Sequence, residues 1–393
     1  MCLRDTRSGA WRLECRRIAQ HRWRQLLGVW VGGLVALALL LPGSLRAMDA
    51  PLVLIVDTDP GVDDALALTW LLNQRERPIQ FAGIVSVFGN SAVESTTSNV
   101  LTVLEMNNRT DIPVIRGAAA PLAQSASLTG WFIHGPDGLW GLGAQHPHDI
   151  SLLPSDYVSF YCAAAVANPG ATVLALGPLT NLAHAAAVCP DALRQLRVVV
   201  LGGAKAGGNK SAVAEFNFWQ DPEAVQQVLD AGIRPQVAPL DTFSQVAVDQ
   251  KLVEKLLRHG NRAVQMLAGP INQYAAVQLQ GGGKILFPDL VAAVYGVDAA
   301  VGVSQSALIA VTATPAPHRG QSIVALSLPE RLALIADDAE LSSLALQAFT
   351  TPGFDLNAAF GAILARRPDN AWWVTGVDGK ALLNAVERGL RGR

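Results

Sequence analysis

The chain has 393 residues, of which 50% are hydrophobic and 16% are charged, so it has enough apolar material for one large core or two modest ones and is not expected to be disordered. Its formal net charge of -2 provides no basic surface for wrapping a nucleic acid. A small molecule is therefore the expected partner.

The first 47 residues have the order of a secretory signal peptide. Arginines precede an uninterrupted apolar run over residues 26–41, and small residues follow up to Ala47. We expect cleavage near Ala47 and export to the periplasm or the extracellular space. A retained membrane anchor is the alternative, but this run rises only about 24 Å as a helix, short of a bilayer core of about 30 Å. We therefore expect no stable membrane span after cleavage.

From residue 51 onward, short β-branched runs alternate with Ala- and Leu-rich helical patterns. The expected strands cover residues 52–56, 81–87, 171–176, 196–201 and 236–240. The expected helices cover residues 63–74, 92–106, 156–167, 179–188 and 222–231. Such alternation indicates the α/β class, with one open, mostly parallel sheet covered by helices on both faces, as in a Rossmann-like core. Residues 48–393 are expected to form one domain with its ligand site at the carboxyl ends of the strands.

Four carboxylates follow the first expected strand within eight positions: Asp57, Asp59, Asp63 and Asp64. Carboxylates this close repel one another unless a cation lies among them or some of them become protonated. Oxygen ligands without a neighbouring Cys or His favour calcium or magnesium. A helix N-terminus alone would explain Asp63 or Asp64, but not the two acids at the strand end as well.

Two cysteines remain after the expected cleavage, Cys162 and Cys189. An oxidising compartment would allow them to pair. Each also lies in an Ala-rich apolar stretch, where a buried free thiol is ordinary. The sequence leaves both outcomes open.

The glycine-rich stretch 202–211 has the general look of a phosphate-binding loop, but the spacing is wrong. A P-loop requires Lys directly after its second conserved glycine, and Asn209 follows Gly208 here. A flexible backbone that presents Asn209 to a ligand is the better interpretation.

The run over residues 57–65 resembles the N-terminal signature of the inosine-uridine-preferring nucleoside hydrolases. Further blocks match that family in the same order, at residues 88–90, 177–181, 208–209, 215–217, 221–224 and 288–289. The resemblance covers most of residues 51–300 and weakens after that. It implies calcium-dependent hydrolysis of the N-glycosidic bond of ribonucleosides to ribose and free base.

The same resemblance implies roles for individual residues. The calcium ligands would be Asp59, Asp64, the backbone carbonyl of Thr180, and Asp289, and Asp59 would also be the general base. The residues matching the ribose-binding positions are Asp63, Asn90, Asn209, Glu215 and Asn217, with Phe216 offering an apolar face. The residue types agree with this, because carboxylates and amides suit ribose hydroxyls, which both donate and accept.

Three departures concern the leaving base and the C-terminal part. Pro288 stands where many members have a histidine able to protonate the base. His134, in the long glycine-rich loop 123–150, resembles a lid histidine and is expected to contact the base instead, and Trp131 or Trp140 is a candidate for stacking on it. The apolar segment 326–368 is expected to be an inserted strand and helix.

Two alternatives to this enzyme are a secreted nucleoside- or sugar-binding protein that has lost turnover, favoured by Pro288, and a haloacid-dehalogenase-type phosphatase. The phosphatase signature expects Thr or Val where Gly61 stands and has no use for the block 215–217. The sequence ranks neither purine against pyrimidine nucleosides nor monomer against homo-oligomer.

Overall fold

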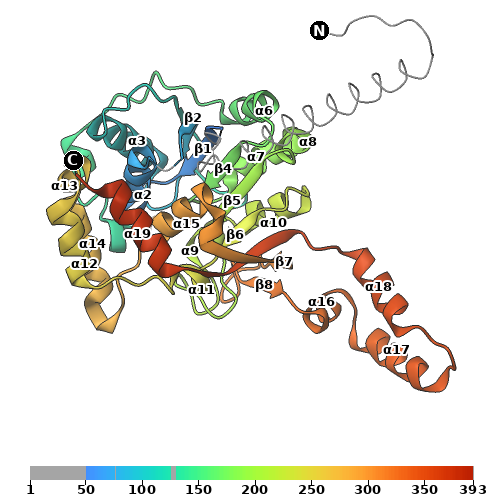
Figure 1. Cartoon of the computed structure of the whole chain (residues 1–393). Helices are drawn as coiled ribbons and strands as arrows, with labels where there is room; N and C mark the ends of the chain where they lie inside the picture. The colour runs from blue at the N-terminus through green and yellow to red at the C-terminus, as the bar shows by residue number, and fades with distance from the viewer. Residues whose placement is uncertain (1–49, 76, 125–129, 393) are drawn as a thin grey trace, which may run out of the picture. The chain divides into compact units, whose positions relative to one another are not determined.

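The computed structural model describes residues 50–75, 77–124 and 130–392, and a single β-sheet runs through this part of the chain (Figure 1). Within these ranges it has nine strands in the order β3-β2-β1-β4-β5-β6-β9-β7-β8. Neighbouring strands from β3 to β9 are parallel, while β7 is antiparallel to both β9 and β8. The strands are β1 Leu52–Thr58, β2 Ile79–Ser86, β3 Val114–Arg116, β4 Thr172–Ala175, β5 Arg197–Leu201, β6 Gln236–Ala238, β7 Gly302–Val311, β8 Ser322–Ala325 and β9 Ala371–Val377.

Helices cover both faces of the sheet. One face carries α2 Val62–Asn73, α3 Val93–Met106, α12 Gln250–His259, α13 Arg262–Met266, α14 Ala268–Leu279, α15 Pro288–Val297 and α19 Gly379–Leu390. The other face carries α6 Tyr157–Ala167, α7 Thr180–Val188, α8 Pro190–Leu193 and α10 Pro222–Asp230. Shorter helices are α4 Trp131–His134, α5 Leu142–Gln145, α9 Phe216–Gln220 and α11 Leu240–Phe243. This confirms the expected α/β class with one open, mostly parallel sheet.

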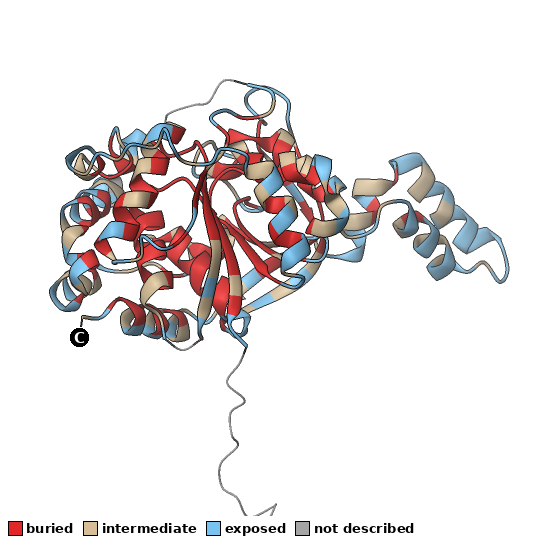
Figure 2. Cartoon of the chain, turned by 90° about the horizontal axis from the view of Figure 1, so that it is seen from above, coloured by how far each residue is buried: buried red, intermediate tan, exposed pale blue. Residues whose placement is uncertain are grey.

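Burial on both faces explains why the strands read as continuous apolar runs. In β1, Leu54 and Val56 pack into the core beneath α2 and α15, while Ile55 between them packs into the opposite core beneath α6 and α7. Figure 2 shows the strands as the most buried layer of the protein. In β1 the polar residues come only at the carboxyl end, Asp57 and Thr58, which is where the candidate site begins.

The segment between β8 and β9 is helical throughout. It contains α16 Leu328–Ile335, α17 Asp338–Thr350 and α18 Leu356–Arg366, so the strand expected within 326–368 is absent from it. Leu332 and Ile363 form a small core of their own between α16 and α18. α17 has no buried residue, and Phe349 in it is 91% exposed. Figure 2 shows this helical segment mostly in the colours of exposed and intermediate residues.

The expected signal peptide, residues 1–47, lies outside the described residues. Among the helices of the described residues, none combines the length and the apolar composition needed to cross a bilayer.

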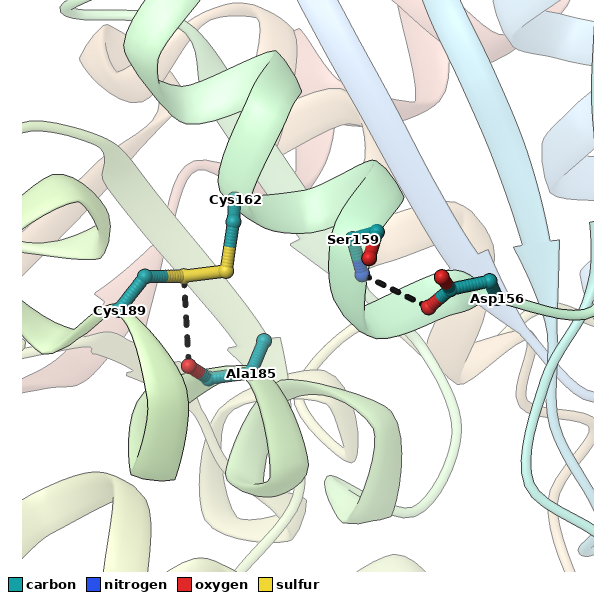
Figure 3. The surroundings of a disulfide bond; sticks show 5 residues. All are labelled: Asp156, Ser159, Cys162, Ala185 and Cys189. Carbon is teal, nitrogen blue, oxygen red and sulfur yellow. Dashed lines mark hydrogen bonds between the residues drawn. A yellow bond between two sulfur atoms is a disulfide. The ribbon is translucent and has the colours of Figure 1, made fainter.

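Cys162 and Cys189 form a disulfide, which resolves the alternative that the sequence left open (Figure 3). Cys162 lies in α6, whose first turn is capped by Asp156 accepting a hydrogen bond from the backbone N–H of Ser159 (3.0 Å). Cys189 follows α7 directly. The bond fastens two helices that cover the same face of the sheet, and the two cysteines are 27 positions apart in the chain.

We predict that replacing both Cys162 and Cys189 by Ser lowers the stability of the protein. Closing a loop of this length is worth about 3 kcal/mol in the chain-entropy treatment of disulfides. The midpoint of chemical denaturation should fall, and reductant should shift the wild-type midpoint by a similar amount. Reductant should leave the double variant unchanged, which serves as the control. A wild-type midpoint that ignores reductant would contradict the prediction.

Candidate active site

A cavity of about 500 Å³ opens where β1, β2 and β5 end. Most of the residues singled out by the sequence line it: Asp59, Asp63, Asn90, His134, Asn209, Glu215, Phe216, Asn217 and Asp289. Asp64 and Thr180 are buried and do not line it. The structure thus brings together side chains that are separated by up to 230 positions, because the carboxyl ends of parallel strands meet at one edge.

The turn from β1 into α2 places the acids at this edge. Asp64 accepts hydrogen bonds from the backbone N–H of Gly61 (3.1 Å) and from the hydroxyl of Thr58 (2.6 Å). Gly61 is required by space, since a Cβ there would collide with the imidazole of His134 and the amide of Asn90. The segment between β1 and α2 is therefore a tight turn, in which Asp64 fixes the start of α2 and Asp63 lines the cavity.

Three carboxylates form the acidic cluster: Asp63, Asp64 and Asp289. They are all buried, and one oxygen from each lies within 4.8 Å of the other two. Oδ1 of Asp63 and Oδ1 of Asp289 are buried without any hydrogen-bond partner. A buried acceptor left without a partner is costly, so two such oxygens side by side fit a bound cation better than an empty polar site. A site whose metal ligands are all oxygen atoms suits a hard cation such as calcium or magnesium.

The acids of this edge bind protons more tightly than ordinary carboxyl groups. Burial, followed by the charge of Asp63, raises the pKa of Asp64 to about 7. Burial and the neighbouring carboxylates also raise the pKa of Asp59 and of Asp289 well above the usual range. These shifts come from protein groups alone, and a cation among the carboxylates would oppose them.

Asp59 stands beside the acidic cluster and not within it. Its Oδ2 accepts a hydrogen bond from the backbone N–H of Asn90 (2.7 Å), and a Cβ at Gly89 or Gly177 would collide with its carboxylate. The side-chain amide of Asn90 donates to the carbonyl of Asp59 (3.2 Å) and to Oδ2 of Asp64 (3.1 Å). Asn90 thereby ties the end of β2 to both acids. The expected roles of Asp59 as ligand and base stay predictions.

Thr180 lies at the start of α7, behind the cavity. Its hydroxyl donates to Oδ2 of Asp221 (2.6 Å), which also accepts from the backbone N–H of Leu122 (3.0 Å). Oδ1 of the same carboxylate caps α10 through the N–H of Ala224 (3.1 Å). Asp221 thus fixes Thr180 in place, and the expected role of the Thr180 carbonyl as a ligand stays a prediction.

The opposite wall is built from the segment after β5. Glu215 accepts backbone hydrogen bonds from Gly203 (3.0 Å), Asn217 (3.0 Å) and Phe218 (3.1 Å). Burial nevertheless raises its pKa to about 7. Asn217 donates to the carbonyl of Leu176 (2.5 Å), just beyond β4, which leaves its side-chain oxygen for a ligand. These acceptors are held rigidly by backbone groups.

His134 has a defined proton arrangement. The backbone N–H of Val62 donates to its Nδ1 (3.1 Å), so Nδ1 carries no hydrogen and Nε2 does. Burial lowers the pKa of His134, which keeps the imidazole neutral. The residue therefore holds the first turn of α2 and offers a ligand only an N–H from Nε2. Pro288 lines the cavity and has no hydrogen to donate.

The apolar lining includes residues that the sequence analysis missed. Phe132 lines the cavity with 63% of its surface exposed, and its ring stacks on that of Trp131 at 4.2 Å. Neither Trp131 nor Trp140 lines the cavity, and the indole N–H of Trp140 donates to the carbonyl of Ile133 (3.0 Å). Tyr274 of α14 adds a second ring, 5.3 Å from His134. Phe132 was within reach of sequence reasoning, as a neighbour of two residues considered there, whereas no motif marks Tyr274.

Comparison with known proteins identifies the family. The family described as inosine-uridine preferring nucleoside hydrolase matches residues 54–384. The chain belongs to this nucleoside hydrolase family. It is 33% identical over 278 residues to a non-specific ribonucleoside hydrolase, RihC, of Salmonella paratyphi A, covering 70% of this chain and 89% of that protein. As a member of this family, the chain is a hydrolase that acts on N-glycosyl compounds. The phosphatase hypothesis is therefore wrong.

Solved structures of nucleoside hydrolases have the same fold. A plant nucleoside hydrolase, PpNRh1, superposes with a TM-score of 0.70 at 25% identity, covering 87% of this chain and 99% of that one. A purine-preferring ribonucleoside hydrolase from Gardnerella vaginalis superposes with a TM-score of 0.68 at 22% identity, covering 86% of this chain and 97% of that one.

The raised pKa values predict an unusual pH dependence for the metal-free protein. Asp57, Asp64 and Glu215 each have a pKa of about 7 in the folded state, against ordinary values near 4 when unfolded. The folded state therefore binds more protons than the unfolded state between about pH 4 and pH 7, so stability falls as the pH rises through this window. In chelator, the melting temperature should be higher at pH 5.5 than at pH 8.

Added calcium serves as the matched comparison. It should raise the melting temperature more at pH 8 than at pH 5.5, because protons compete with the cation for the same carboxylates at the lower pH. A metal-free protein that becomes more stable from pH 5.5 to pH 8 would contradict this account.

Proposed function

We propose that this nucleoside hydrolase cleaves the N-glycosidic bond of ribonucleosides with the help of a bound calcium ion. The observation that supports this best is the acidic cluster of Asp63, Asp64 and Asp289, with its two partnerless oxygens at the floor of a cavity. The hydroxyl-binding side chains around that floor suit a ribose. The relative named as a non-specific ribonucleoside hydrolase supports the same substrate class.

Asp64 and Asp289 would hold the ion, since they belong both to the acidic cluster and to the ligand set that the family resemblance implies. Asp63 has an oxygen close enough to those of Asp64 and Asp289 to contact the same ion. When bound, calcium would supply positive charge that lowers the pKa of water and polarises the sugar hydroxyls. Asp59 is competent as a base only when ionised, and positive charge near the acidic cluster favours its ionised form.

The reaction adds water across the bond between C1′ of the ribose and the base nitrogen. Asp59 removes a proton from the water as its oxygen joins C1′, and the C1′–N bond breaks as the base departs. Positive charge develops on the sugar ring at that moment. Asp63, Glu215 and Asn217 surround the ring with oxygen acceptors that are already fixed in place, and this stabilises the charge.

The planar base of the nucleoside requires an apolar surface, unlike the polar side chains that surround the ribose. Phe132, Phe216 and Tyr274 offer aromatic faces in the same cavity, and His134 offers the N–H of Nε2. Phe132 replaces the two tryptophans as the candidate for stacking on the base, because it alone of the three lines the cavity.

We also propose that the protein is exported and works in an oxidising compartment. The basic, apolar and small-residue order of the first 47 residues supports this. The disulfide between Cys162 and Cys189 gives independent support, because such bonds are rare in a reducing cytosol.

A direct test incubates the purified protein with inosine and with uridine, in calcium or in chelator, and measures released ribose and base. Release in calcium that chelator abolishes supports the proposal. Because Pro288 removes one route for protonating the base, a binding protein without turnover is the competing outcome. Tight nucleoside binding without any ribose release would select it.

Asp59→Asn should separate the base from the metal site. Asparagine keeps the shape of the side chain but accepts no proton, so we expect turnover to fall by a factor of about 100 or more. Nucleoside and calcium binding, measured by calorimetry, should remain detectable. Asp289→Asn should instead weaken calcium binding, and Asp111→Asn, at an exposed position, should change neither. Unchanged turnover in Asp59→Asn would refute its role as the base.

A further inference from the structure

The residues just before Asp289 lead the chain from α14 into α15. Three consecutive glycines, residues 281–283, stand at the start of this connection. Glycine is the residue with the most backbone freedom to lose on folding, so a run of glycines does little to fix the direction of the chain that follows. Ile285 is anchored by one backbone hydrogen bond, which its carbonyl accepts from the N–H of Val248 (2.9 Å). The anchoring contacts nearer to Asp289 come from α14.

Gln278, near the end of α14, holds Leu286 by both of its backbone groups. The side-chain Nε2 donates to the carbonyl of Leu286 (3.1 Å), and the N–H of Leu286 donates to Oε1 (3.1 Å). Each backbone group fits only one end of the amide, so the orientation of the amide is fixed. Gln278 is half-buried and lines the cavity. One side chain therefore links the wall of the cavity to the segment that precedes Asp289.

Tyr274 lies one turn before Gln278, on the same side of α14. Its ring stacks on that of Phe287, with 5.5 Å between the ring centroids and 24° between the ring planes. Both rings are buried. α14 therefore holds two consecutive residues, Leu286 and Phe287, and the next residue already begins α15.

The carboxylate of Asp289 depends on this backbone for its place in the acidic cluster. Its Oδ1 is buried and accepts no hydrogen bond, so the position of that oxygen follows from the backbone and the rotamer of Asp289. Groups that orient a metal ligand commonly contribute a factor of about 10 to 100 to the affinity for the metal. For Asp289 the groups that fix the preceding backbone take that task.

We propose that Gln278 is a positioning residue for Asp289, which sets where the carboxylate meets the cation of the acidic cluster. The inference rests on the proposed function, since it concerns the same cation site. α15 is buried from Asp289 to its end, so its packing holds the helix itself in place. Loss of the hydrogen bonds to Leu286 therefore displaces the first turn of α15, where Asp289 lies, and not the whole helix.

The test measures calcium binding by calorimetry in wild type, Gln278→Met and Gln278→Asn. Methionine keeps the length of the side chain and suits a helix, but it makes neither hydrogen bond to Leu286. We expect the affinity of Gln278→Met for calcium to fall about tenfold or more. Asparagine keeps the amide but is one methylene too short to hold both backbone groups, so Gln278→Asn should lose affinity as well. The second variant decides the matter if the first does not fold.

Gln226 of α10 provides the matched control. It is also half-buried, and both ends of its amide are bonded: Oε1 accepts from the N–H of Val311 (3.1 Å), and Nε2 donates to Asp230 (2.8 Å). Gln226 does not line the cavity. Gln226→Met should lower the melting temperature in chelator, as Gln278→Met does, while its affinity for calcium stays that of wild type. The comparison separates positioning of the cation ligand from a general loss of hydrogen bonds.

Release of base from inosine at low and at saturating calcium gives a second readout. Gln278→Met should lose activity at low calcium and regain most of the wild-type kcat at saturating calcium, because its defect lies in the affinity for the ion. Gln226→Met should show no such dependence on calcium.

Equal calcium affinity in wild type and in the folded Gln278 variants would overturn the role of Gln278 alone. A wild type that binds calcium but cleaves no nucleoside would overturn the proposed reaction, and the affinities would still decide the role of Gln278. A wild type that binds no calcium would overturn both.

Discussion

The crowding of carboxylates at the end of β1 is the constraint on which the rest of the site depends. Asp57, Asp59, Asp63 and Asp64 are all buried, and Asp289 joins them from α15. Burying this much negative charge is costly unless each oxygen finds a donor or a cation. The fold supplies the donors through Asn90, the turn at Gly61 and the hydroxyl of Thr58. The two oxygens it leaves without partners mark where positive charge belongs.

Asp57, at the end of β1, belongs to a hydrogen-bond network on the other side of the sheet from α2. Asp57 does not line the cavity, and its carboxylate accepts hydrogen bonds from Tyr161 (2.5 Å) and from the amide of Asn181 (3.1 Å). The same amide donates to the carbonyl of Ser86 (3.0 Å) at the end of β2, and its oxygen accepts from the N–H of Ala118 (2.8 Å). One network therefore joins the ends of β1 and β2 to α6 and α7. These hydrogen bonds fix the strand ends that carry the acids relative to the helices on the opposite face.

The amino-terminal half of the fold was predictable because its cores impose a regular pattern. The strand at 52–56 and the helix at 63–74 were both foreseen, since a strand buried on both faces reads as a short apolar run and a helix buried over Val62–Leu71 reads as a longer Ala- and Leu-rich one. The cavity residues were foreseen from motifs at strand ends. β9 was harder, because nothing local shows that it pairs with β6 and β7 after a long helical excursion. The disulfide and the place of Tyr274 in the cavity depend on tertiary placement, which spacing along the chain does not encode.

The position of β9 has a consequence for how the chain folds. β9 lies between β6 and β7, yet it is the last strand in the chain and is preceded by α16, α17 and α18. The sheet is therefore divided into two separate pieces until residues 371–377 arrive and close the gap. Contacts between segments so distant along the chain slow folding, because the entropy of closing the long intervening loop is lost before the new contacts stabilise the pairing. The exposed edges of β6 and β7 are open to pairing with other chains during that interval, so this strand is the point at which folding competes with aggregation.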